Sequence, residues 1–117
     1  MNPLEKAAEQ TAEEQVKEEL QASVQTFTLS KPYLFDGESH TEIKLNFDAL
    51  TGEDLIACER QLNVLYPGTT IPMKEISKQY LAVVAAKAAG VPVEFMQKLP
   101  AKDFSKVTIR VQNFLLV

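Results

Sequence analysis

Polar and apolar side chains alternate in two successive stretches between residues 24 and 47 of this 117-residue chain. The apolar positions of one parity are Phe27, Leu29, Tyr33 and Phe35 in the first stretch and Ile43, Leu45 and Phe47 in the second. A period of two is typical of half-buried β-strands. Between the stretches, the Asp36-Gly37 pair favours a turn. Residues 24–47 are therefore predicted to form an antiparallel β-hairpin.

Pro32 falls inside the first predicted strand. Because proline has no N–H to donate to a neighbouring strand, we expect this strand to lie at an edge or to bulge there. Two strands alone are marginally stable in water, so helices must cover the apolar face of the hairpin.

Beyond the hairpin, apolar residues recur at spacings of three and four, which indicates amphipathic helices. The predicted helices cover about 52–65, 74–89, 92–97 and 101–116. Thr51 and Asp54 are placed to cap the first helix, and Gly90 ends the second. The predicted fold class is α+β: an N-terminal antiparallel hairpin packed against three to four α-helices in a single domain, residues 23–117.

Residues 1–22 differ from the rest of the chain in charge. They contain six acids and two bases, a net charge of −4 that equals the charge of the whole chain, so residues 23–117 hold ten of each. Asn2 and Pro3 favour a helix start, and the apolar positions that follow are Leu4, Ala8, Ala12, Val16 and Leu20. Because most of these are alanine, packing them buries little area. We expect an acidic helical or disordered arm, either ordered by a partner or simply solvated.

The charge pattern also restricts the partners. A neutral body with an acidic arm lacks the clustered Lys and Arg that nucleic-acid binding requires, so no nucleic acid is expected. No run of about 20 apolar residues predicts a membrane span. The first residues carry proline and glutamates where a signal peptide has positive charge and an apolar run. We expect the protein to remain in the compartment where it is made.

The sequence offers little material for catalysis. It has one cysteine, Cys58, and one histidine, His40, whereas nucleophilic and metal sites need several matched groups. We read Cys58 as a buried apolar residue and His40 as a solvated one; a Cys58/His40 hydrolase has no local motif behind it. The glycines form no phosphate-binding motif. No catalytic residue, metal ligand or cofactor is predicted, and the protein is not expected to be an enzyme.

An apolar stripe near the C-terminus is the candidate partner-binding site. Its residues are Phe104, Val107, Val111, Phe114 and Leu115. Such periodicity is usually core packing, so the stripe is either a helix docked on the hairpin or a surface that clasps an amphipathic helix of a client protein.

Two parts of the sequence resemble a known family. The first runs through Thr26-Phe27-Thr28-Leu29-Ser30-Lys31-Pro32, Phe35-Asp36-Gly37, Leu45 to Leu55 and Glu59-Arg60-Gln61-Leu62. The second runs through Tyr80-Leu81, Ala85 to Pro92, Leu99 to Phe104 and Val111 to Leu115. In order and spacing these segments resemble the tail assembly chaperones of contractile-tailed bacteriophages and prophages, over roughly residues 26–116.

The resemblance implies a protein of the infected bacterium's cytoplasm that is absent from the mature virion. Its implied client is the tape-measure protein, which it keeps soluble during tail assembly. Tail-tube subunits and a frameshift-extended form of the chain itself are further implied partners. The acidic arm departs from the family pattern. A different interpretation is a small acidic adaptor or inhibitor that binds one folded partner through the edge strand of its hairpin.

Overall fold

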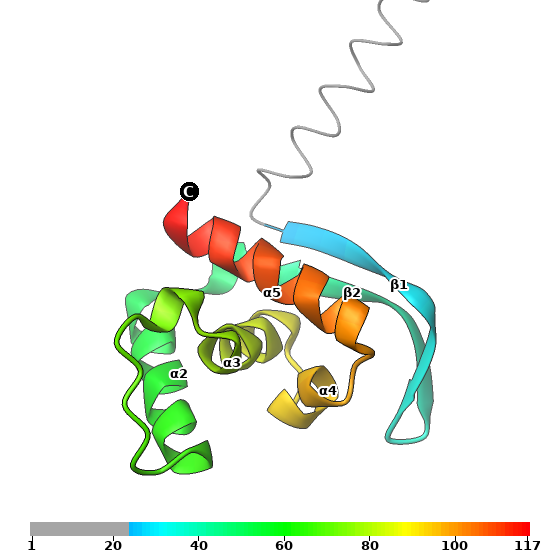
Figure 1. The fold of residues 1–117 in the computed structure, drawn as a ribbon. Coiled ribbons are helices and arrows are strands. Elements are labelled where there is room, and N and C mark those ends of the chain that lie inside the picture. The colour runs from blue at the N-terminus through cyan, green and yellow to red at the C-terminus, as the bar shows by residue number, and fades with distance from the viewer. Residues whose placement is uncertain (1–23) are drawn as a thin grey trace, which may run out of the picture.

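The structure, a computed structural model, describes residues 24–117 and contains a hairpin followed by helices (Figure 1). Strands β1 (Val24–Phe35) and β2 (Glu38–Asn46) pair antiparallel. The 3-10 helix η1 (Phe47–Ala49) leads to α2 (Gly52–Leu65). The remaining elements are η2 (Lys74–Ile76), α3 (Lys78–Ala89), α4 (Val93–Gln97) and α5 (Ala101–Leu116). The α+β class and the N-terminal hairpin are confirmed; the acidic arm predicted for residues 1–22 lies outside the described residues.

The hairpin turns where the sequence predicts. Asp36 and Gly37 have φ values of 51° and 80°, which a two-residue hairpin turn of this hand requires at both central positions. Asp tolerates this region better than most residues, and glycine adopts it without steric cost. The strand prediction extends one residue too far, because Phe47 begins η1.

The expected irregularity at Pro32 is present as a bulge. Thr28 faces Glu42 and Tyr33 faces His40, so Leu29–Pro32 stand opposite the single residue Thr41. The backbone at the bulge finds a partner on α5 instead of β2. The Ser30 N–H and hydroxyl both donate to the Asp103 carboxylate, and the hydroxyl bond is 2.8 Å long.

Helix α3 is the centre of the core. It packs against α2, α4, α5 and β2, and the residues from Tyr80 to Ala86 are all buried. α5 lies across α3 and also contacts β1 (Figure 1). Gly90 ends α3 with a φ of 68°, the left-handed conformation that glycine adopts readily at a helix C-terminus. The alanines of α3 allow its neighbours to approach closely.

The helix predicted for residues 74–89 is wrong at its start. Lys74–Ile76 form a 3-10 turn, and Ser77 is extended before α3 begins at Lys78. The reason is local: the Ser77 hydroxyl accepts the Tyr80 N–H, so serine acts as a helix cap and not as a helical residue. The helix predicted for 92–97 likewise begins one residue later, at Val93, because Pro92 is extended.

Candidate functional site

The predicted partner-binding stripe lies on α5, mostly facing inward. Val107 and Val111 are at most 1% exposed and belong to the core. Phe104 and Leu115 are half-buried. Phe114 is 39% exposed, and one face of its ring stacks on Phe47 with centroids 4.5 Å apart. In this conformation a partner can therefore reach Phe104, Phe114 and Leu115 in part, but not the two valines.

An open apolar groove of about 400 Å³ lies beside the Phe104 end of this stripe. Its apolar lining consists of Leu65, Ala82, Val83, Val93, Leu99, Ala101 and Phe104. These residues come from the end of α2, the first half of α3, α4 and the start of α5. Ala82 and Ala101 leave room that larger side chains would fill. Concave apolar surfaces of this volume are typical of sites that accept part of a ligand or an apolar side chain.

The polar lining of the groove carries one charge, the ammonium group of Lys78. Tyr66, Gln79 and Gln97 complete the lining, and the Gln97 amide donates to the Tyr66 hydroxyl at 3.4 Å. Lys78 donates to Ser105 at 3.3 Å, and within residues 24–117 it has no carboxylate partner. The groove therefore combines an apolar floor with a lysine at its mouth, which suits an amphipathic helix bearing a carboxylate.

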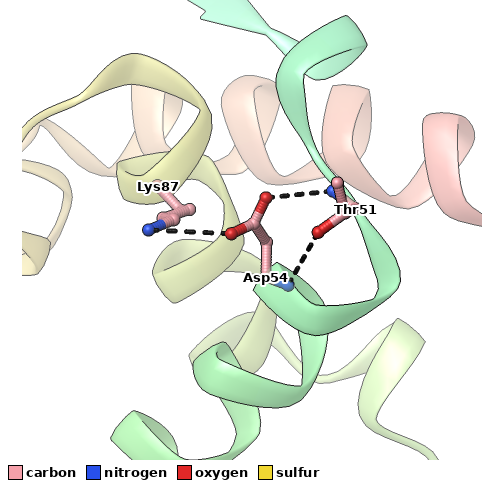
Figure 2. A network of polar contacts seen from close by, with 3 residues as sticks. All are labelled: Thr51, Asp54 and Lys87. Atoms are coloured by element: carbon pink, nitrogen blue, oxygen red, sulfur yellow. Dashed lines mark hydrogen bonds and ion pairs between the residues drawn. The ribbon is translucent and has the colours of Figure 1, made fainter.

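A second hollow of about 490 Å³ lies near the start of β1. Val24, Leu50, Lys44 and Gly90 are among its lining residues. Part of its polar lining is already engaged, because Asp54 accepts the Thr51 N–H at 3.0 Å and pairs with Lys87 at 3.8 Å (Figure 2).

The two contacts between Thr51 and Asp54 in Figure 2 are the capping box that the sequence predicts for α2. The Thr51 hydroxyl accepts the Asp54 N–H at 3.2 Å, while the Asp54 carboxylate accepts the Thr51 N–H. Two backbone donors that would lack helical partners are thus satisfied. We assign this carboxylate a structural role at the start of α2.

His40 and Cys58, the two residues considered for nucleophilic chemistry, lie in different surroundings. His40 is less solvated than the sequence predicts. It is half-buried near the tip of the hairpin, and its ring lies edge-on to that of Phe95, with centroids 5.0 Å apart. Cys58 is 2% exposed on α2, where burial raises the pKa of its thiol and Lys87 opposes this to a smaller extent. The thiol is therefore protonated and shielded at neutral pH, which is the opposite of an activated nucleophile.

An aromatic cluster fastens the hairpin tip to α4. Tyr33 and Phe35 both pack edge-on to Phe95, with centroids 5.0 and 5.2 Å away. The Tyr33 hydroxyl donates to the Phe95 carbonyl oxygen at 2.9 Å. This short helix and the hairpin tip therefore hold each other in place.

Two further absences concern the described part of the chain. Residues 24–117 contain no group of three or more His, Cys, Asp or Glu side chains placed to hold a metal ion. None of the helices in that range combines the length and the apolar character needed to cross a bilayer.

The groove itself could not be predicted from the sequence. Lys78 and Ala82 are one helical turn apart on α3, a signal that a shared face exists. Nothing in their spacing indicates that α2, α4 and the start of α5 leave that face open.

Comparison with known protein families gives a match over most of the chain. The sequence model of the family described as "Phage tail assembly chaperone proteins, E, or 41 or 14" matches residues 26–116. Comparisons with curated proteins and with solved structures found no match. The matched range begins near the start of β1 and ends with α5, so it includes the hairpin, the groove and the stripe. The chain belongs to the family of phage tail assembly chaperones.

Proposed function

We propose that this protein binds the tape-measure protein of its phage and keeps it soluble while the tail is assembled. It acts in the cytoplasm of the host bacterium and is absent from the mature virion. The observation that carries the proposal is the open apolar groove in a member of a tail assembly chaperone family. Surface recognition, and no catalysis, is the role we assign to it.

The client explains why such a surface is needed. A tape-measure protein is long, largely helical and apolar, and it aggregates unless its apolar faces are covered. An amphipathic client helix inserts apolar side chains between Ala82, Ala101 and Phe104, the residues that form the wall and floor of the groove. A groove of this size gives weak binding per copy. Many copies along one client add up to strong cover.

Co-expression tests the proposal directly. The tape-measure gene of the same phage is expressed with and without this chain, and the soluble fraction of its product is measured. We expect the client to be mainly insoluble alone and mainly soluble with the chaperone. Equal insolubility in both cases contradicts the proposed function.

Ala101→Glu tests the groove. Ala101 is exposed at the first position of α5, where a carboxylate is compatible with the helix dipole, so the variant should fold. The new side chain places a charge at the apolar wall, and we expect the soluble fraction of the client to fall at least several-fold. Ala57→Glu is the matched control, because Ala57 is an exposed alanine on α2 that does not line the groove. If both variants protect the client as well as the unaltered chain, the client binds elsewhere.

We also propose tail-tube subunits and a frameshift-extended form of the chain as partners. An extension would continue from α5, next to Phe114, Leu115 and the half-exposed Leu116. Affinity purification of the chaperone from infected cells, followed by mass spectrometry, tests both partners.

A further inference from the structure

The groove and the acidic arm, residues 1–22, complement each other. We propose that the arm docks as a helix into the apolar groove of its own chain, with Lys78 holding a glutamate of the arm. The docked arm then occupies the place of a client helix until a client displaces it. The competition with the client rests on the proposed function, but the docking does not.

The groove provides an apolar floor and a positive mouth. Lys78 is its one charged lining residue, and its ammonium is exposed. Lys98 and Lys102 flank the lining residues Gln97, Leu99 and Ala101 in sequence and are also exposed. From Val93 to Lys102 the chain has one acid, Glu94, against these two lysines.

The carboxylate nearest to this segment in sequence is already engaged. Asp103 is 2% exposed and accepts hydrogen bonds from Ser30 on the side of β1. Asp103 therefore does not neutralise Lys98 and Lys102. An acidic segment is the complementary occupant.

The arm has the matching pattern. Its apolar positions are spaced by four residues, and three of them are followed directly by a glutamate: Leu4-Glu5, Ala8-Glu9 and Ala12-Glu13. On a helix, this places carboxylates along one border of the apolar stripe. The small alanines suit a groove whose own wall is made in part of Ala82 and Ala101.

The arm is long enough to reach the groove. β1 begins beside the C-terminal half of α5, because Arg110 donates to Gln25 at 3.1 Å. Phe104 in the groove lies six residues before Arg110, which is about 9 Å along the helix. Residues 21–23 span up to about 10 Å when extended, and a helix over residues 3–20 is about 27 Å long. Its middle can therefore lie in the groove.

The surface of α5 and of the neighbouring η2 is partly apolar. Ile109 on α5 is 54% exposed, and Ile76 on η2 is 53% exposed. We expect Val16 and Leu20, the apolar residues of the arm nearest to the body in sequence, to contact this surface.

The docking is expected to be weak and reversible. A mostly alanine stripe buries little area, and exposed ion pairs contribute little individually and are screened by salt. The tether compensates, because it gives the arm a high effective concentration at its own groove. Such a contact shields the groove without blocking a client that has larger apolar side chains.

Paramagnetic relaxation in the full chain tests the contact in the absence of any client. A nitroxide is attached at Gln10→Cys, on the face of the arm opposite its apolar stripe. Cys58 is buried, and a sample of the unaltered chain checks that it takes no label. We expect the amide signals of Ala82, Gln97 and Ala101 to lose most of their intensity and those of Gly37 and Ser39, at the hairpin tip, to keep it.

Two charge reversals locate the site. Lys78→Glu should restore the groove signals, whereas Lys44→Glu, an exposed lysine of the second hollow, should leave the broadening unchanged. If Lys44→Glu releases the arm and Lys78→Glu does not, the arm lies in the second hollow and the proposal is wrong. Uniform or absent broadening also overturns it.

A mixing experiment checks that the contact is within one chain. Isotope-labelled chain without nitroxide is mixed with unlabelled chain that carries it. Undiminished groove signals support docking within one chain, and broadened signals would show that a neighbour's arm is the occupant. Because no client is present, these results are independent of the co-expression outcome.

Discussion

At the scale of single residues, Asp103 accepts the hydrogen bonds of Ser30 in the bulge of β1. It is the one buried acid among residues 24–117, and both carboxylate oxygens face Ser30. Leu29–Pro32 have one residue of β2 opposite them, so regular strand pairing cannot satisfy this backbone. The negative charge of this carboxylate is also stabilising at the start of α5, which is the positive end of the helix dipole.

Asp103→Ala should therefore destabilise the fold. We expect a loss of about 1–3 kcal/mol in the free energy of unfolding, the usual cost of removing one partner of a buried hydrogen-bonded group. Urea unfolding followed by circular dichroism measures it. Ser30→Ala removes the hydroxyl bond alone and should have a smaller effect; the reverse order would contradict the role given to the carboxylate.

Tyr80 makes the free energy of unfolding depend on pH in the alkaline range. Burial, with smaller contributions from neighbouring groups that include Cys58 and Glu59, raises its pKa to about 12. The hydroxyl donates to the Leu55 carbonyl oxygen at 3.4 Å. Because the folded state holds this proton more tightly than the unfolded state, the stabilisation is complete below pH 10 and is lost as the pH rises from 10 to 12.

The expected loss over this interval is roughly 2–3 kcal/mol, from about 1.4 kcal/mol for each unit of pKa difference. The free energy of unfolding, measured at successive pH values, gives the slope of stability against pH. Tyr80→Phe should flatten it, since phenylalanine has no proton to lose. An equal slope in both proteins would mean that other groups cause the alkaline loss.

At the scale of elements, the start of α2 has two polar interactions of different strength. The capping box is strong, and the ion pair is weak. Thr51 and Asp54 exchange two hydrogen bonds, whereas the Lys87–Asp54 pair is 3.8 Å long and its lysine side chain is 52% exposed. Thr51→Ala should reduce the free energy of unfolding by about 1 kcal/mol. Lys87→Ala should change it by less than about 1 kcal/mol, because exposed ion pairs contribute little.

Thermal and urea unfolding of these two variants, with Thr51→Ser as a conservative replacement, give the comparison. Serine keeps the hydroxyl acceptor, so Thr51→Ser should remain near the stability of the unaltered chain. A larger loss from Lys87→Ala than from Thr51→Ala would mean that the ion pair, and not the cap, holds this helix end.

At the scale of the whole molecule, periodicity predicts most of the elements. Alternation of Phe27 and Leu29 with polar residues identifies a strand, and the Asp36-Gly37 pair identifies its turn, because these signals depend on neighbours in sequence. The sequence does not predict the start of α3, because Ser77 is compatible with a helix interior but caps the helix in the structure.

The binding surface is less predictable than the elements. The five residues of the apolar stripe follow from periodicity, which does not distinguish a core face from an exposed one. The structure places Val107 and Val111 inside the core and leaves Phe114 partly open. The groove depends on how four helices, with lining residues from Leu65 to Phe104, pack against one another, and single-sequence patterns carry no information on such packing.

The bulge at Leu29–Pro32 has a consequence for the proposed gathering of many copies on one client. The outer edge of a strand is a template for another strand, and crowding of copies favours fibre growth by such edge-to-edge addition. Pro32 lacks a donor, and the Ser30 N–H is directed to Asp103. The outer edge of β1 therefore presents no continuous row of hydrogen-bonding groups over Val24–Phe35. The β1 edge of one copy is therefore a poor template for a strand of a neighbouring copy.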